Sequence, residues 1–373
     1  MARLRPDTPP RPLVVNGTPL SVVGNLRAYV CGITPYDVTH LGHAATYIWT
    51  DTAVRVLGAE GTPVTLARNV TDVDETLFAE AVRRGEHYDQ LAAMQKFSFD
   101  RTMTALRVRT PTVEPSARQS VHRVIELVQA LLDGGHAYLV DGHVFARTNA
   151  SAIGLEREDA LNLSRQFGDA PEDDRKQDPF DVTVWHGTAE NDISWPSPWG
   201  PGRPGWHAEC AAMVLGTFGS GVDLHAGGAD LGFPHHACET ILAEAVTGVT
   251  PFARAWLRIG TVRIDGAKMA KSAGNLVLVD DLLTDHTPAA VRLLCLARAW
   301  DEPWEYDRAD LEKAERTLDE LFTAAARNTD SRAGAERIQD ALLANLDVPT
   351  ALDTALEEGG FAARHLLDVL ALS

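Results

Sequence analysis

The stretch LRAYVCGITPYDVTHLGHAATY, residues 26–47, indicates how the chain folds. It opens with a short apolar run that ends at Cys31 and continues through Gly32 into a Pro-containing turn, which is typical of a strand followed by a turn. From His40 to Leu57 apolar residues recur at helical spacing, and Pro63–Asn69 has the pattern of a second strand. A strand, a glycine-containing turn, a helix and a strand predict a βαβ unit that opens a parallel sheet.

Further helices and strands are expected on both sides of one long irregular stretch. Ser116–Leu132 is amphipathic and is stopped by the two glycines that follow it, so we expect a helix there. Residues 150–205 lose periodicity, and their tryptophans favour an ordered loop over a cleft. Two more strands are expected at Gly221–Ala226 and Trp256–Ile264, and another helix at Asp310–Ala325. The sequence therefore predicts an α/β fold.

Composition indicates a globular protein that acts on small molecules. The 373 residues allow two or three domains, and a net charge of −18 weighs against a nucleic-acid partner, because polyanion binding needs a basic face. We see neither a secretory signal nor a run of apolar residues long enough to span a membrane, and we expect a cytoplasmic protein, monomeric or homodimeric. Four scattered cysteines in that compartment predict thiols rather than disulfides.

Two short motifs have the composition of a nucleotide site. In His40-Leu41-Gly42-His43, Gly42 lets a nucleotide approach the backbone at a helix start, and the two histidines can stabilise charge on an α-phosphate. The alternative is a pair of surface histidines at a helix start. In Lys268-Met269-Ala270-Lys271-Ser272, two of the chain's five lysines lie within one turn, where they can neutralise departing pyrophosphate. The alternative there is a solvated surface turn.

Together and in this order, the two motifs resemble the HIGH and KMSKS signatures of class I aminoacyl-tRNA synthetases. The resemblance implies a Rossmann-type nucleotide-binding catalytic domain with an inserted α+β connective region, followed by a small C-terminal helical bundle. It also implies Mg-ATP binding by the motif residues and by Gly227, Gly228 and Asp230. The expected divisions are an N-terminal lead-in, the first Rossmann half, the insertion, the second Rossmann half and the bundle, at residues 1–25, 26–110, 111–200, 201–285 and 286–373.

A third set of residues combines thiol and imidazole groups. Cys31, Cys210 and His235 would border the same cleft, with Cys238 or Glu239 beside His235. Zn²⁺ prefers such ligands, but the spacing excludes a zinc finger, and from spacing alone buried structural cysteines explain the pattern better.

Several segments resemble cysteinyl-tRNA synthetases over roughly residues 25–285. They are YVCGITPYD, NVTDVDE, SWPSPWGPGRPGWHAEC, FPHH and KMAKSAGNL. The resemblance implies a zinc ion held by Cys31, Cys210, His235 and Glu239 that binds the thiolate of substrate cysteine, with Cys238 as a further candidate ligand. A soft thiolate is a far better zinc ligand than a hydroxyl, so such a site selects cysteine without editing.

The CGITPYD segment resembles more closely a related family, the cysteine:glucosaminyl-inositol ligases of mycothiol biosynthesis. That resemblance implies that L-cysteine is activated as an adenylate and joined to the amine of an inositol glycoside, with Thr34, Thr71 and Trp206 around the cysteine. Packing of the loop is the alternative role for Trp206. Only residues 273–373 follow the lysine motif, which leads us to expect no anticodon-binding domain and no tRNA partner. The chain departs from the ligases at Ala237-Cys238-Glu239 and at Ala270.

Three functions remain open at this point. The first is the ligase with glucosaminyl-inositol as acceptor. The second is a paralogue that transfers cysteine or a related amino acid to another small amine or carrier. The third is a non-catalytic zinc- or nucleotide-binding regulator derived from a synthetase, which the retained histidines and lysines disfavour. Cysteine-dependent pyrophosphate exchange separates the third function from the other two.

Overall fold

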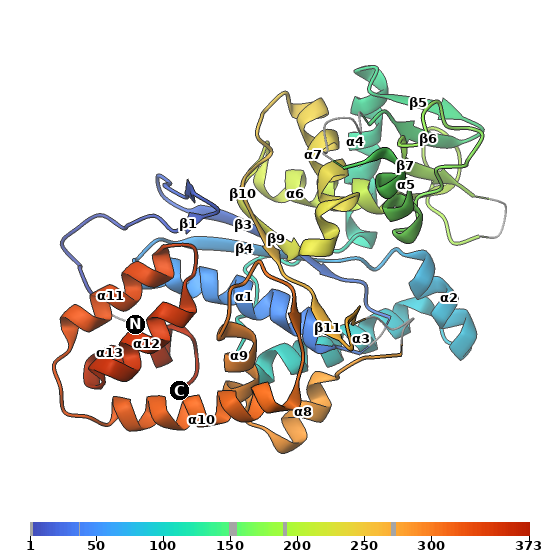
Figure 1. Cartoon of the computed structure of the whole chain (residues 1–373). Helices are drawn as coiled ribbons and strands as arrows, with labels where there is room; N and C mark the ends of the chain where they lie inside the picture. Colours follow the sequence, from blue (N-terminus) through green and yellow to red (C-terminus); the bar gives the residue numbers. More distant parts are fainter. Residues whose placement is uncertain (1–2, 37, 149–154, 189–191, 270–273) are drawn as a thin grey trace.

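A four-stranded parallel sheet lies at the centre of the molecule (Figure 1). The computed structural model describes residues 3–36, 38–148, 155–188, 192–269 and 274–373. In the order β10-β9-β3-β4, every neighbouring pair of strands is parallel. The carboxyl ends of all four strands therefore meet at one edge of the sheet, where open α/β folds bind their ligands. The strands are β3 (Leu26–Ile33), β4 (Val64–Val70), β9 (Val222–Gly228) and β10 (Ala253–Ile259).

The predicted βαβ unit is confirmed. Strand β3 leads into helix α1 (Leu41–Ala59), and β4 follows α1 and pairs with β3 in parallel. Helix α1 is buried on nearly every side because it lies between the sheet and helices of the C-terminal part of the chain. This double burial explains why its apolar residues extend beyond a single face.

Most of the chain between β4 and β9 lies beside the sheet, on the side of α6 and α7 (His235–Thr247), whereas α3 packs against α1 in the main core (Figure 1). The antiparallel sheet in this part of the chain has the order β5-β6-β7-β8. The predicted helix at Ser116–Leu132 is present, but its first turn is the 3₁₀ segment η1 (Arg118–Ser120), and α4 begins at Val121. The elements of this part are α2 (Glu75–Arg84), α3 (Tyr88–Ala105), η1, α4 (Val121–Asp133), β5 (Ala137–Val140), β6 (His143–Ala146), α5 (Arg157–Gln166), β7 (Val182–Gly187), β8 (Gly202–Pro204) and α6 (Trp206–Phe218).

Residues 150–205 are more regular than the predicted loop. Helix α5 and strands β7 and β8 occupy much of this stretch. In strand β7, Val182 and Val184 lie on either side of the less buried Thr183, and together with Trp185 they are almost fully buried in the apolar cluster of this region. The many Asp, Pro and Gly residues on either side of β7 hide this short alternation in the sequence.

The strand predicted at Trp256–Ile264 is in fact two strands. Strand β10 ends at Ile259, and β11 (Val262–Ile264) belongs to a separate sheet with β12 (Ala267–Lys268) and β13 (Trp304–Glu305). The break falls at Gly260, where a Cβ would lie 2.1 Å from the carbonyl oxygen of Glu302. Only glycine fits this close approach of two backbones, and the apolar pattern carries no sign of it.

Helices form most of the chain after the sheet. The helix predicted at Asp310–Ala325 is present as α10, which begins two residues earlier. These helices cover α1 on the side away from the sheet, while α6 and α7 (His235–Thr247) lie on the other face (Figure 1). They are α8 (Val279–Asp285), α9 (Pro288–Leu296), α10 (Arg308–Ala325), α11 (Arg332–Leu343), α12 (Val348–Glu358) and α13 (Gly360–Val369).

The predicted fold class is confirmed: a parallel α/β sheet is combined with an inserted α+β part and a set of C-terminal helices. The five domain limits remain a prediction. Within the described residues, none of the helices has the length and apolarity needed to span a membrane.

Candidate functional site

A cavity of about 350 Å³ opens at the carboxyl edge of the parallel sheet. The end of β3, the start of α1, the end of β4 and the segment after β9 all contribute to its wall. Thirteen of the predicted site residues line it: Cys31, Thr34, His40, Gly42, His43, Thr71, Trp206, Cys210, Gly228, Asp230, His235, Lys268 and Met269. Predicted residues Lys271 and Ser272 lie outside the described residues.

Four side chains at one end of the cavity form a compact group of metal-ligating atoms. The ligand atoms of Cys31, Cys210, His235 and Glu239 all lie within 4.8 Å of one another, and all four residues are buried. Cys31 comes from β3, Cys210 from α6, and the other two residues from α7. Two thiols, an imidazole and a carboxylate match the ligands of tetrahedral zinc sites.

Local geometry brings these residues together. His235 and Glu239 are four positions apart on α7, so they face the same side of the helix. Trp206 and Cys210 have the same spacing on α6, and both line the cavity. Helix α6 begins directly after Gly205, where a Cβ would lie 1.9 Å from the carbonyl oxygen of Thr183, so glycine allows the chain to pass close to β7 before the helix starts.

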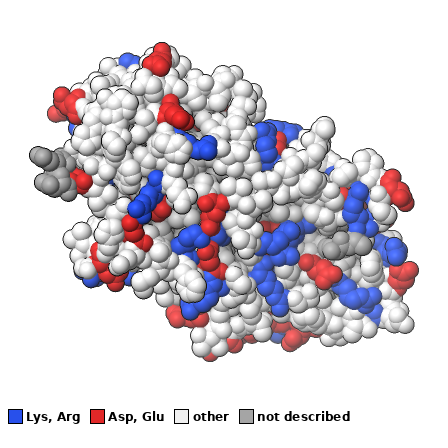
Figure 2. Space-filling model, turned by 180° about the vertical axis from the view of Figure 1, so that it is seen from behind, with Lys and Arg blue, Asp and Glu red and all other residues white. Residues whose placement is uncertain are grey.

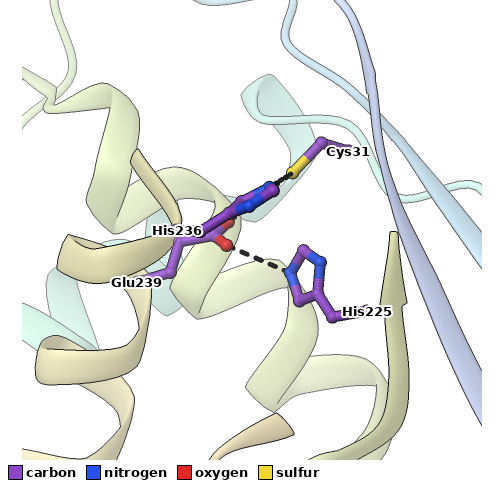
Figure 3. Close-up of side chains that lie close together, drawn as sticks. All are labelled: Cys31, His225, His236 and Glu239. Carbon is purple, nitrogen blue, oxygen red and sulfur yellow. Dashed lines mark hydrogen bonds and ion pairs between the residues drawn. The ribbon is translucent and has the colours of Figure 1, made fainter. Parts of the chain in front are cut away.

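Two buried histidines that the sequence analysis missed extend this group (Figure 3). His225 on β9 lies 3.0 Å from Glu239 Oε2, and His236 Nε2 lies 3.6 Å from Cys31 Sγ. With Cys31 and Glu239 they form a second, overlapping set of ligand atoms within 4.8 Å. In the sequence, the signal for His236 is the pair His235-His236, and the signal for His225 is a polar residue inside an apolar strand.

The remaining two cysteines lie elsewhere. Cys238 is buried among apolar side chains of α4, α6 and the antiparallel sheet, and it belongs to neither set of ligand atoms. Cys295 is buried in the core that α9 shares with α1. The spacing of α7 explains the position of Cys238, because a residue directly before Glu239 points away from the side that faces the cavity.

The charges in the group favour a bound cation. Burial alone would raise the pKa of the Glu239 carboxyl, but His235 and His225 hold it well below its usual range. Burial opposes the charged form of His235, yet Glu239 and Cys210 raise the pKa of this imidazole to about 10. In the metal-free protein, a proton on His235 thus balances the buried carboxylate, and a divalent cation can replace it.

The nucleotide end of the cavity holds the two predicted motifs. The rings of His40 and His43 stack with their centroids 3.8 Å apart. Lys268 forms an ion pair with Asp230 across the cavity. A Cβ at Gly228 would lie 2.3 Å from Asp230 Oδ1, so glycine is needed where this carboxylate folds back on the chain.

Predicted Gly227 does not line the cavity. A Cβ there would lie 2.8 Å from His236 Nε2, so this glycine leaves room for the histidine behind the cavity wall.

Between the two ends lie the residues predicted to surround the cysteine. The indole of Trp206 stacks on the imidazole of His235 at 4.1 Å. Asn69, which the sequence analysis missed, donates from Nδ2 to the Thr71 hydroxyl and accepts the Gly32 N–H at 2.7 Å. Asn69 thereby connects Thr71 to the backbone beside Cys31, and its place in NVTDVDE was the available signal.

Comparison with known proteins gives consistent results. Residues 19–316 match the family described as tRNA synthetases class I (C) catalytic domain. The L-cysteine:1D-myo-inositol 2-amino-2-deoxy-alpha-D-glucopyranoside ligase of Mycobacterium ulcerans is 41% identical over 352 residues, which cover 90% of this chain and 84% of that protein. The protein of the same name from Rhodococcus jostii is 41% identical over 358 residues, covering 89% and 85% of the two chains.

Solved structures show the same fold at low identity. Methionyl-tRNA synthetase of Mycobacterium tuberculosis in complex with methionyl-adenylate has a TM-score of 0.63 and 16% identity, covering 94% of this chain and 82% of that one. A putative arginyl-tRNA synthetase of Campylobacter jejuni has a TM-score of 0.60 and 14% identity, covering 94% and 90%.

Proposed function

Because the chain belongs to the family of class I (C) tRNA synthetase catalytic domains, we propose that it is an ATP-dependent, amide-forming ligase that activates L-cysteine. We propose glucosaminyl-inositol as the acceptor, on the basis of the name of its relatives at 41% identity, which places the reaction in mycothiol biosynthesis. The observation that carries the proposal is the meeting of the buried ligand group and the two nucleotide motifs in one cavity.

Selection of cysteine rests on the group formed by Cys31, Cys210, His235 and Glu239. A zinc ion held by these residues would supply a Lewis acid that binds the thiolate of the substrate and discriminates against the hydroxyl of serine. The protein contributes the shape around it: Trp206, stacked on His235, and Thr71, held by Asn69, define the space left for the amino acid. The donor set fits zinc, because two thiols, an imidazole and a carboxylate, all buried, bring their ligand atoms within 4.8 Å of one another.

Adenylate formation uses the other end of the cavity. The carboxylate of cysteine forms a bond to the α-phosphorus of Mg-ATP, and the bond from that phosphorus to the bridging oxygen of pyrophosphate breaks. His40 and His43 are placed to stabilise charge on the α-phosphate, and Lys268 to stabilise the departing pyrophosphate. The resemblance of the lysine motif assigns the same role to Lys271. The ion pair with Asp230 holds the Lys268 ammonium at the cavity in the absence of nucleotide.

Amide formation completes the reaction. The neutral amine of the acceptor attacks the carbonyl carbon of the adenylate, the bond from that carbon to the phosphate oxygen breaks, and AMP leaves as the amine loses a proton. The main contribution of the protein to this step is to hold the two reactants in position.

The surface charge supports a small acceptor rather than tRNA. On the face shown in Figure 2, basic side chains lie beside acidic ones and form no continuous basic surface. Elsewhere among the described residues, Arg68 and Lys96 each form ion pairs with both Asp100 and Glu114. Charges that are already neutralised within the protein contribute little to the binding of a polyanion.

The chain departs from the ligases at Ala237-Cys238-Glu239. Cys238 packs in the apolar cluster and belongs to neither set of ligand atoms, whereas Glu239 is part of the ligand group. We propose that Glu239 completes the metal site, which leaves the first of the three functions as the leading one.

Exchange of pyrophosphate into ATP tests the activation step. We expect zinc-loaded protein to catalyse exchange that depends on cysteine and that serine supports poorly. Exchange with no amino-acid dependence, or none at all in folded protein with zinc and Mg-ATP, would refute the proposed activation and favour a binding protein.

A further inference from the structure

A line of buried polar contacts runs from the inserted part of the chain to the ligand group. Asp169, just after α5, lies with Oδ2 3.3 Å from His207 Nε2. His207 Nδ1 lies 2.9 Å from His235 Nδ1. His235 Nε2 faces Glu239 Oε1 at 3.4 Å. The side chain of His207 is 3% exposed and that of Asp169 is 14% exposed, so water competes little for these contacts.

The chemistry of the three groups fixes where the protons lie when His235 acts as a ligand. The carboxylate of Asp169 can only accept, so His207 carries its proton on Nε2 and donates it to Asp169. His207 Nδ1 is then an acceptor, and His235 must donate to it from Nδ1. This arrangement leaves the lone pair of His235 Nε2 free on the side that faces Glu239 and the two thiols.

The segment that contains Asp169 also contacts Trp206, the residue directly before His207. The ring of Phe167 stacks over Trp206 with the ring centroids 6.1 Å apart, and the same indole also stacks on His235 at 4.1 Å and on His207 at 5.4 Å. Gly168, between Phe167 and Asp169, has a φ of +87°, a conformation that favours glycine. The turn at Gly168 thus sets Phe167 against Trp206 and Asp169 against His207, the first two residues of α6.

We propose that Asp169 is a positioning residue which, through His207, fixes the tautomer and the ring orientation of His235 as a metal ligand. The inference rests on the proposed zinc site and extends it, because it makes a residue of the inserted region part of cysteine selection. Carboxylates behind a ligating histidine hold the ring and raise its basicity, and their loss typically weakens metal binding about 10- to 100-fold.

The test compares Asp169→Asn with Asp173→Asn in the full-length protein. Asparagine keeps the shape of the side chain but removes the charge that forces His207 to donate. Asp173 lies on the same segment, but its partner is Arg175, so its loss should leave the metal site unchanged. Zinc affinity is measured on metal-free protein by competition with a chromophoric chelator, and KM is measured separately for cysteine and ATP in the exchange reaction.

We expect Asp169→Asn to bind zinc about 10- to 100-fold more weakly and to raise KM for cysteine but not for ATP, while Asp173→Asn matches the unmodified protein. His207→Gln, which breaks the same line of contacts, should behave like Asp169→Asn and serves as a second variant if the first fails to fold. Zinc affinity in folded Asp169→Asn or His207→Gln equal to that of Asp173→Asn would overturn the inference and leave the proposed function intact. Unmodified protein that binds no zinc would overturn both.

Discussion

Arg292 on α9 should be one of the residues on which the stability of the whole molecule depends most. Its side chain is fully buried, and its guanidinium donates to the carbonyl oxygens of Leu106 at 2.9 Å and Leu370 at 3.0 Å. A third bond, at 3.0 Å, goes to the carboxylate of Asp51 on α1. The arginine therefore joins the ends of α3 and α13 to the helix that lies against the central sheet.

The cost of Arg292→Met follows from what remains unbonded. Asp51 keeps two other partners, Arg55 at 2.7 Å and Arg109 at 3.2 Å, so its charge stays paired. The two carbonyl oxygens lose their donor, and each buried group left without a bond costs about 1–3 kcal/mol. Methionine fills much of the volume of the stem, so we expect the free energy of unfolding to fall by about 4 kcal/mol.

Urea unfolding followed by tryptophan fluorescence measures this loss, with Arg101→Met as the matched control. Arg101 is 64% exposed and is paired only with the half-exposed Asp280 among the described residues, so its removal should cost less than about 1 kcal/mol. Equal losses for the two variants would refute the argument that the buried guanidinium anchors the C-terminal helices.

Three further predictions concern the site and the response to acid. Lys268→Met should slow pyrophosphate exchange about 10²- to 10³-fold with little change in KM for ATP. The control is Lys313→Met, at an exposed residue of α10, which should leave the exchange rate unchanged. Equal exchange rates for the two variants would remove Lys268 from catalysis. Cys210→Ala should lose the zinc that Cys295→Ala retains, as measured by metal analysis, and retention by both would exclude Cys210 as a ligand. Burial lowers the pKa of His365 to about 4, so the folded state binds fewer protons than the unfolded state between pH 4 and 6.5. The contribution of this residue to the free energy of unfolding should be fully present above pH 6.5 and should be lost as the pH drops from 6.5 to 4. His365→Gln should flatten the fall in melting temperature over this pH range, and an unchanged slope would show that other groups cause it.

The elements around α1 could be predicted because periodicity and turn residues report local structure. Each of the three elements of the predicted βαβ unit has a continuous run or regular spacing of apolar residues. These elements are the strand ending at Cys31, the helix after His40 and the strand before Thr71. The division of Trp256–Ile264 could not be predicted, because it depends on contact between Gly260 and Glu302, far apart in sequence. Strand β7 was missed because its alternation is short and the residues around it are typical of loops.

The site residues, too, could be predicted where the signal is local in the sequence and not where it depends on contacts made by the fold. The lysine and histidine motifs are contiguous, so their chemistry is visible in the sequence. His225, Asn69 and Asp169 act through partners that only the fold brings close, so the local sequence signals of His225 and Asn69 do not reveal what these side chains contact. The resemblance to cysteine-activating enzymes supplied the ligand group that spacing alone left open.

Formation of the amide tests the central claim most directly. Zinc-loaded protein is incubated with Mg-ATP, cysteine and glucosaminyl-inositol, and products are identified by mass spectrometry while AMP is quantified. The account predicts cysteinyl amide of the glucosamine in amounts equal to AMP. AMP and pyrophosphate released without that amide, or no turnover at all, would contradict it.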